Sequence, residues 1–123
     1  MNPRVLAQQL GQALKETPEF LSVQASRVKV EAHEAARLML QDFKQRQEEY
    51  RKALVAGKVK EDETNELRRL AEIVGYNPYI RELLSAEARL ADLVLSLQNE
   101  MMLAAGLAEL AGEGEQDTDA KDS

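Results

Sequence analysis

The sequence predicts an all-α fold, and its composition carries that prediction. The 123 residues are 44% hydrophobic and 31% charged but only 4% aromatic, so aliphatic and long charged side chains dominate. These residue types have high helix propensity. Residues that break helices are rare, with six glycines and three prolines. We therefore expect two long helices plus shorter helices in an elongated, oligomeric helical bundle, with a single helical domain over residues 1–112.

The first two predicted helices meet at Thr17 and Pro18. Leu and Ala residues between Val5 and Lys15 recur at steps of three and four, which indicates a short amphipathic helix. Thr17 can cap the next helix, and Pro18 suits a first helical position. No Gly or further Pro interrupts the chain from Pro18 to about Ala56, so we expect one long helix there, which could bend near His33. Its predicted apolar stripe consists of Leu21, Ala25, Val28, Ala32, Ala35, Met39, Phe43, Tyr50 and Leu54.

The next helix is expected to begin after Gly57, at a cluster of acidic residues. Residues 61–63 are all Glu or Asp, which complement the positive end of a helix dipole. The helix should end at a turn in which Gly75 takes the left-handed C-terminal position. Asn77 can then cap the following helix, and Pro78 fills its first turn. This is the clearest turn signal in the chain.

The last predicted helix runs from Pro78 to about Ala111. Its apolar residues follow a heptad seam with one flaw at Glu87, which either pairs with an Arg across an interface or meets water. Residues 101–108 contain no polar side chain, so this half needs burial on several sides. We expect a second copy to dock there, the alternative being that the first helix folds back over it. The predicted interface residues are Leu90, Val94, Leu97, Met101, Met102, Ala104, Ala105 and Ala108.

The charge distribution argues against nucleic acid as the main partner. The net charge is −6, and residues 113–123, with five acidic residues against Lys121, hold −4 of it. We expect this segment to be a disordered acidic tail. Basic residues recur every seven positions at Arg37, Lys44, Arg51 and Lys58, a ridge that could follow a phosphate backbone. Acidic neighbours and the lack of interleaved aromatic residues favour a solvated helix face instead.

No motif in the sequence supports catalysis or a cofactor. The absence of Cys excludes disulfides and Cys-held zinc or iron–sulfur clusters in this chain. His33-Glu34 begins like a zinc-protease helix, but Arg37 stands where the second His is needed and offers no lone pair. We therefore expect no catalytic residue, no metal site, no cofactor and no small-molecule substrate. Without a visible signal peptide or membrane-length apolar run, we expect a cytoplasmic protein that does not bind membranes.

Five segments stand out in this order of elements: Leu10–Phe20, Asp42-Phe43, Gly57-Lys58, Glu61–Glu63 and Asn77–Glu87. Through these segments the chain resembles the YlbF/YmcA family of small bacterial helical proteins, including its YheA-like branch. The resemblance covers about residues 5–110, and residues 77–87 are its most specific part. It implies an all-α protein that forms dimers or higher oligomers and has no family catalytic residues. Relatives act in a complex that modulates competence, sporulation and biofilm formation and adjusts RNA cleavage by ribonuclease Y. The Cys-held iron–sulfur clusters of that complex cannot carry over, since this chain has no Cys.

Three functions remain in competition on these grounds. The favoured one is a non-catalytic protein-protein interaction module, a regulatory adaptor that binds itself and family paralogues or ribonuclease Y. The first alternative is a self-assembling structural bundle with no regulatory partner. The second is an RNA-binding accessory protein, which would depend on the basic ridge.

Overall fold

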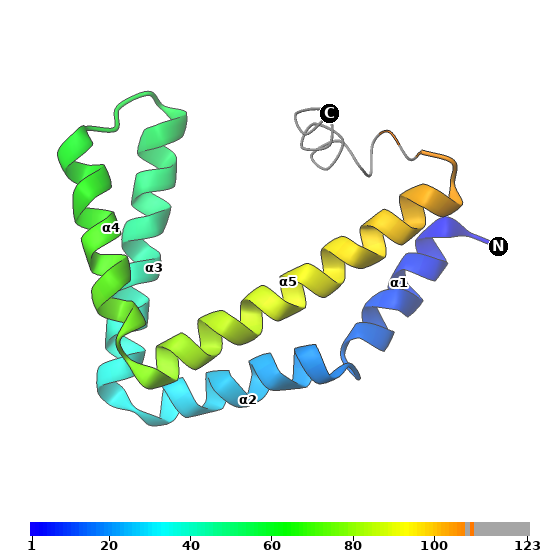
Figure 1. The fold of residues 1–123 in the computed structure, drawn as a ribbon, viewed down its shortest axis with the longest axis horizontal. Coiled ribbons are helices and arrows are strands. Elements are labelled where there is room, and N and C mark those ends of the chain that lie inside the picture. The colour runs from blue at the N-terminus through cyan, green and yellow to red at the C-terminus, as the bar shows by residue number, and fades with distance from the viewer. Residues whose placement is uncertain (108, 110–123) are drawn as a thin grey trace, which may run out of the picture. The chain divides into compact units, whose positions relative to one another are not determined.

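The structure, a computed structural model, describes residues 1–107 and 109, and these contain helices and no strand. The prediction of an all-α fold is confirmed. Five helices follow one another along the chain (Figure 1): α1 (Pro3–Leu14), α2 (Pro18–Ala32), α3 (Glu34–Val55), α4 (Glu61–Gly75) and α5 (Pro78–Ala104).

The chain divides into two compact units, and the division falls within α5. The first unit is Met1–Glu87, and the second begins at Ala88. The prediction of one helical domain over residues 1–112 stays a prediction. The acidic tail predicted at 113–123 and the predicted interface residue Ala108 lie outside the described residues.

Local capping signals set several helix starts as the sequence predicts. The Thr17 hydroxyl oxygen accepts a hydrogen bond from the Phe20 N–H at 3.2 Å, and Pro18 is the first residue of α2. The three acidic residues 61–63 form the first turn of α4, where they face the positive end of the helix dipole. These starts depend on residues within one helical turn, which is why the sequence alone reveals them.

The expected single helix from Pro18 to about Ala56 is wrong, because it is broken at His33. The backbone there is extended, with φ −117° and ψ 107°, so α2 and α3 are separate helices. The His33 ring stacks on the Tyr79 ring, with centroids 3.8 Å apart, and its Nδ1 donates to the Lys29 carbonyl oxygen at 2.7 Å. The ring therefore satisfies an orphan carbonyl at the end of α2 while packing against α5.

The break also changes which residues form the core. Val28 of the predicted stripe is 68% exposed, and Leu21 is exposed as well, whereas Val23 and Val30 are buried. The predicted stripe assumes that one helix continues through His33 with a constant helical phase. Because the backbone is extended at His33, the faces of α2 and α3 are not in phase. On α3 the stripe is correct at Phe43. The buried apolar residues are Val23, Val30, Ala36, Leu40, Phe43, Val74, Ile80, Leu83 and Ala86.

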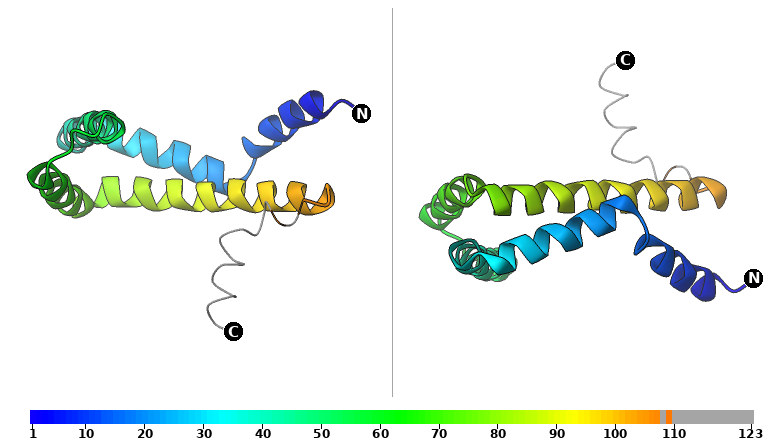
Figure 2. Two further views of the ribbon diagram at one scale, coloured as in Figure 1. Left: turned by 90° about the horizontal axis from the view of Figure 1, so that it is seen from above. Right: turned by 90° about the horizontal axis from the view of Figure 1, so that it is seen from below.

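Within the first unit, α3 and α4 form an antiparallel helical hairpin. They lie side by side in Figure 1 and remain adjacent in both views of Figure 2. At the end of α3, Gly57 has φ +71°, and the Lys58 N–H donates to the Ala53 carbonyl oxygen at 2.9 Å. With the bond from the Gly57 N–H to the Leu54 carbonyl oxygen, this is a Schellman motif. The chain is thus turned back directly onto α3.

The prediction that the last helix continues to about Ala111 is wrong, since α5 ends at Ala104. Gly106 adopts φ +78°, and the Leu107 N–H donates to the Met102 carbonyl oxygen at 2.7 Å, so a second Schellman motif closes this helix. None of the described helices combines the length and the apolar character needed to cross a membrane.

Candidate functional site

The turn between α4 and α5 is built around the side chain of Asn77. Its Oδ1 accepts hydrogen bonds from the N–H groups of Tyr79 at 3.0 Å and Ile80 at 3.2 Å, and Pro78 is the first residue of α5. The prediction that Gly75 takes a left-handed conformation is wrong. Gly75 is the last residue of α4, and the right-handed Tyr76 that follows donates its N–H to a preceding carbonyl. Short backbone bonds close this end of α4, so no residue with positive φ is needed.

Two ion pairs connect α2 to the first turns of α5. Lys29 Nζ lies 3.2 Å from Glu82 Oε1, and Arg27 lies 3.8 Å from Glu87. The order of the pairs shows that the two helices run antiparallel here. Glu87, the flaw in the predicted seam, therefore pairs with an Arg of its own chain. Both pairs are solvent-accessible, so they fix orientation more than they stabilise.

The predicted interface residues lie on the part of α5 that belongs to the second unit, apart from Ala105, just after the helix, and Ala108. Met101 is 57% exposed, and Ala104 and Ala105 are exposed too. Leu95 and Leu103, which the seam does not include, are also exposed, so apolar side chains occur on more than one side of this helix. The accessibility of Leu90, Val94, Leu97 and Met102 is intermediate. Their role in an interface stays a prediction.

The helix α1 offers a second open apolar face, at the start of the first unit. None of its side chains is buried. Leu10 is 45% exposed, and the exposed fractions of Val5 and Leu6 are similar. Leu6 and Leu10 are four residues apart and share one face of the helix. An amphipathic helix with no buried residue contributes little to the core of its unit, and its apolar face stays partly accessible to solvent.

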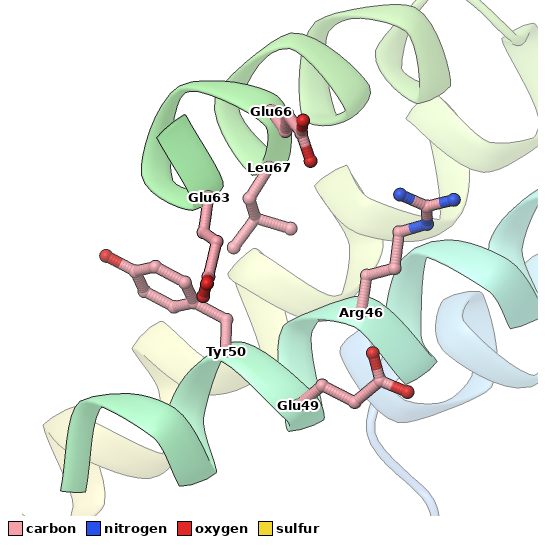
Figure 3. Close-up of a pocket in the computed structure, with 6 residues that line it drawn as sticks. All are labelled: Arg46, Glu49, Tyr50, Glu63, Glu66 and Leu67. Carbon is pink, nitrogen blue, oxygen red and sulfur yellow. The ribbon is translucent and has the colours of Figure 1, made fainter. Parts of the chain in front are cut away.

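A concave surface lies between α3 and α4, and we call it the α3–α4 groove. Figure 3 shows its first hollow, of about 180 Å³, with side chains from both helices around it. An adjoining hollow of about 220 Å³ shares Arg46 and Glu66 and adds Arg69, Leu70 and Ile73. The first hollow is lined by Arg46, Glu49, Tyr50, Glu63, Glu66 and Leu67.

Sequence reasoning missed this groove because its lining is mostly charged. Such residues on a helix indicate a solvated face, and only the pairing of α3 with α4 brings them together. A hydrogen bond of 3.0 Å between the Tyr50 hydroxyl and Thr64 Oγ1 ties the two helices beside it. The signal that could have revealed it is Tyr50 itself, an aromatic residue among charged ones on α3.

The predicted basic ridge on α3 is partly neutralised. Arg51 donates two hydrogen bonds to the Glu48 carboxylate, at 2.6 and 3.1 Å. These bonds, together with the positive charge of Arg51, hold the pKa of Glu48 below its ordinary value. The same bonds, together with the negative charge of Glu48, raise the pKa of Arg51. Among the described residues, no three His, Asp or Glu side chains are grouped so that they could hold a metal ion.

The chain matches one family model and is similar to several bacterial proteins. Residues 5–104 match the family model described as control of competence regulator ComK, YlbF/YmcA. A UPF0342 protein of Caldicellulosiruptor bescii is 37% identical over 93 residues, covering 75% of this chain and 78% of the relative. A UPF0342 protein of Symbiobacterium thermophilum is 39% identical over 89 residues, covering 72% of this chain and 80% of the relative. No solved structure gives a significant match.

Proposed function

This chain belongs to the YlbF/YmcA family, and we propose that it acts as a non-catalytic adaptor that binds other proteins through its helices. The family is described by its control of the competence regulator ComK, and a regulatory role of this kind can be carried out by binding alone. The all-helical fold supports the same role. Relatives named only as UPF0342 proteins add no substrate or reaction.

The observation that carries the proposal is apolar surface left open on helices in both units. In the second unit Leu103 is 62% exposed and Met101 is 57% exposed, and in the first unit α1 has no buried residue. Several exposed apolar side chains on one helix are a feature of protein interfaces. We assign self-association to the interface residues of the second unit, from Leu90 to Ala108, so that the chain is proposed to work as a dimer or higher oligomer.

The net energy of such an interface is not large. Burying about 500 Å² of apolar surface would contribute about 12 kcal/mol before association costs. Those costs are roughly 4–15 kcal/mol, so they offset from about a third to all of this gain. The association is therefore expected to be moderate at most and to depend on concentration. That suits an adaptor which exchanges its own copies for family paralogues or ribonuclease Y, the heterologous partners that the family resemblance implies.

The RNA-binding alternative has less support. Arg51 of the basic ridge is already paired with Glu48, and Arg46 on the same helix is paired with Asp42 at 3.4 Å. The net charge of −6 opposes attraction to a polyanion. The structural-bundle alternative uses the same apolar surfaces and differs only in having no partner beyond its own copies.

A capture experiment distinguishes adaptor from structural bundle. Tagged protein would be pulled down from its host's lysate with ribonuclease added, and the bound proteins identified by mass spectrometry. Recovery of a family paralogue or ribonuclease Y supports the adaptor, whereas recovery of only untagged copies of the chain favours the bundle.

Self-association needs its own measurement, by sedimentation velocity over a range of concentrations. The variant Leu97→Glu/Met101→Glu is expected to shift the protein to monomer, because two charges would have to be buried. Glu100→Gln, on the same helix, is the control and should leave the distribution unchanged. A monomeric wild-type protein at every concentration would refute the assignment of this interface.

A further inference from the structure

We propose that the α3–α4 groove binds an amphipathic helix of a partner protein, one with basic side chains beside its apolar face. The inference rests on the proposed adaptor function and names the chemistry of a heterologous partner. It concerns a surface formed entirely by the first unit, so it does not depend on how the chain self-associates.

The dimensions of the groove fit a helix better than a small molecule. Its two hollows share Arg46 and Glu66 and so lie next to each other along α4, from Glu63 to Ile73. This stretch of α4 rises by about 15 Å, or nearly three helical turns. Each hollow, at about 180 and 220 Å³, is below the roughly 300 Å³ at which small-molecule pockets begin. Two adjoining hollows over this length match the helix-in-groove mode of peptide recognition, in which successive side chains of one helix enter successive hollows.

The floor of the groove is apolar. Leu67, Leu70 and the Tyr50 ring are half-buried along it, and Ile73 at one end is 50% exposed. The neighbouring Val74 is completely buried in the core, whereas the Ile73 side chain is not part of the core. Apolar contacts at the centre with charged groups at the edge are the usual arrangement of a protein interface.

The charges around the groove favour a basic partner. Three carboxylates line the first hollow, those of Glu49, Glu63 and Glu66. Two cations also line the groove: Arg46 lies 3.4 Å from the Asp42 carboxylate and is already paired, and Arg69 lines the adjoining hollow. The three glutamates still exceed these cations in number. Lys or Arg side chains on a docking helix would complement this excess of negative charge. RNA and an anionic membrane surface would be repelled by it.

The test uses a fluorescent synthetic helical peptide with Leu at steps of three and four and Lys at the other positions. A matched peptide carries Glu in place of Lys. Fluorescence anisotropy with the full chain is expected to give at least tenfold tighter binding of the Lys peptide. Equal binding of the two peptides, or none, would overturn the proposal.

Variants locate the binding to the groove. Glu63→Gln/Glu66→Gln is expected to weaken binding of the Lys peptide by roughly tenfold, the size of effect that 1.4 kcal/mol produces. Glu31→Gln/Glu72→Gln removes the same charge outside the groove and should leave the affinity unchanged. Ile73→Ser should weaken binding without changing charge. Equal losses in both double variants would mean non-specific attraction to an acidic protein, and the proposal would be wrong.

Other occupants of the groove give different results. Sedimentation of Glu63→Gln/Glu66→Gln should match the wild type. An altered oligomeric state would mean that a second copy fills the groove, and preferential binding of an RNA oligonucleotide or anionic vesicles would mean another class of ligand. Either result overturns the proposal. The Leu97→Glu/Met101→Glu variant should still bind the Lys peptide, so failure of self-association and failure of the groove are separable.

Discussion

Gly57 ends α3 in a conformation that residues with a Cβ atom rarely adopt. Its φ of +71° is in the left-handed region, and a Cβ atom added there would meet nothing within 4 Å. Any penalty for replacing it is therefore conformational and not steric. Gly11, in the middle of α1, is equally open but has ordinary helical φ. The two glycines isolate the effect of backbone conformation.

Gly57→Ala is expected to lower the free energy of unfolding by about 1 kcal/mol, because alanine is strained at positive φ. Gly11→Ala should be neutral or stabilise α1 by up to about 1 kcal/mol, because alanine is the better helix former. Urea unfolding followed by circular dichroism measures both. A neutral Gly57→Ala variant would show that the left-handed turn is not essential for ending α3.

The ion pair of Glu48 and Arg51 predicts a small pH dependence of stability. The hydrogen bonds from Arg51, together with its positive charge, lower the pKa of Glu48 in the folded state. A carboxyl group with a lowered folded pKa contributes stability above its unfolded pKa, and this contribution is lost as the pH falls through the folded value. The melting temperature of Glu48→Gln should therefore be slightly below that of the wild type at neutral pH.

The difference should vanish in acid, below the lowered pKa of Glu48. Thermal unfolding of both proteins across this range is the measurement. The double variant Glu48→Gln/Arg51→Gln serves as control, since its difference from Arg51→Gln alone should be almost independent of pH. Because the pair is exposed, a large effect would contradict this explanation.

At the scale of helices, the sequence predicts where a helix begins or ends better than it predicts which of its faces is buried. Thr17, Asn77 and Gly57 act within one turn of the helix they cap, and their residue types reveal that role. The break at His33 has no such signal. It is stabilised by stacking on Tyr79, far along the chain, which only the tertiary structure provides. Gly106 is also a signal, for the end of α5, but the alanine-rich sequence around it favoured a longer predicted helix.

The buried face of α2 was predicted wrongly for a different reason. Leu21 and Val28 suggest one apolar side, and Val23 and Val30 suggest another. The neighbouring helices decide which side is covered, and periodicity cannot anticipate them once the phase is reset at His33. The α3–α4 groove is similar, since its lining residues come from two helices and are charged on both. A linear pattern of charge does not reveal a concave surface.

The first turns of α5 provide a test of the observed core. Ile80 is 0% exposed, whereas Leu84, four residues later, is partly exposed. Ile80→Ala is expected to lower the free energy of unfolding by about 2–5 kcal/mol, through lost apolar burial and the cavity that remains. Leu84→Ala should cost clearly less. Chemical denaturation of both variants is the measurement, and equal losses would place the core of this helix elsewhere.

At the scale of the whole molecule, the distribution of charged residues opposes binding of RNA and leaves binding of a protein partner possible. The variant Lys44→Glu/Arg51→Glu reverses half of the basic ridge, and it should leave capture of a protein partner intact, since Arg51 already serves Glu48. The pull-down with ribonuclease added provides the comparison, with the wild type beside it. Loss of the partner on this double change would instead favour the RNA-binding accessory.

The short link between α3 and α4 has a kinetic consequence. The hydrogen bond between the Tyr50 and Thr64 hydroxyls spans 14 residues of sequence, whereas the ion pair of Lys29 with Glu82 spans 53. Closing the longer loop costs roughly 1 kcal/mol more entropy, so we expect the hairpin to form before α2 docks on α5. Tyr50→Phe should then slow refolding, while Glu82→Gln should mainly speed unfolding. Stopped-flow refolding is the measurement, and formation of the α3–α4 hairpin is expected to precede docking of α2 on α5.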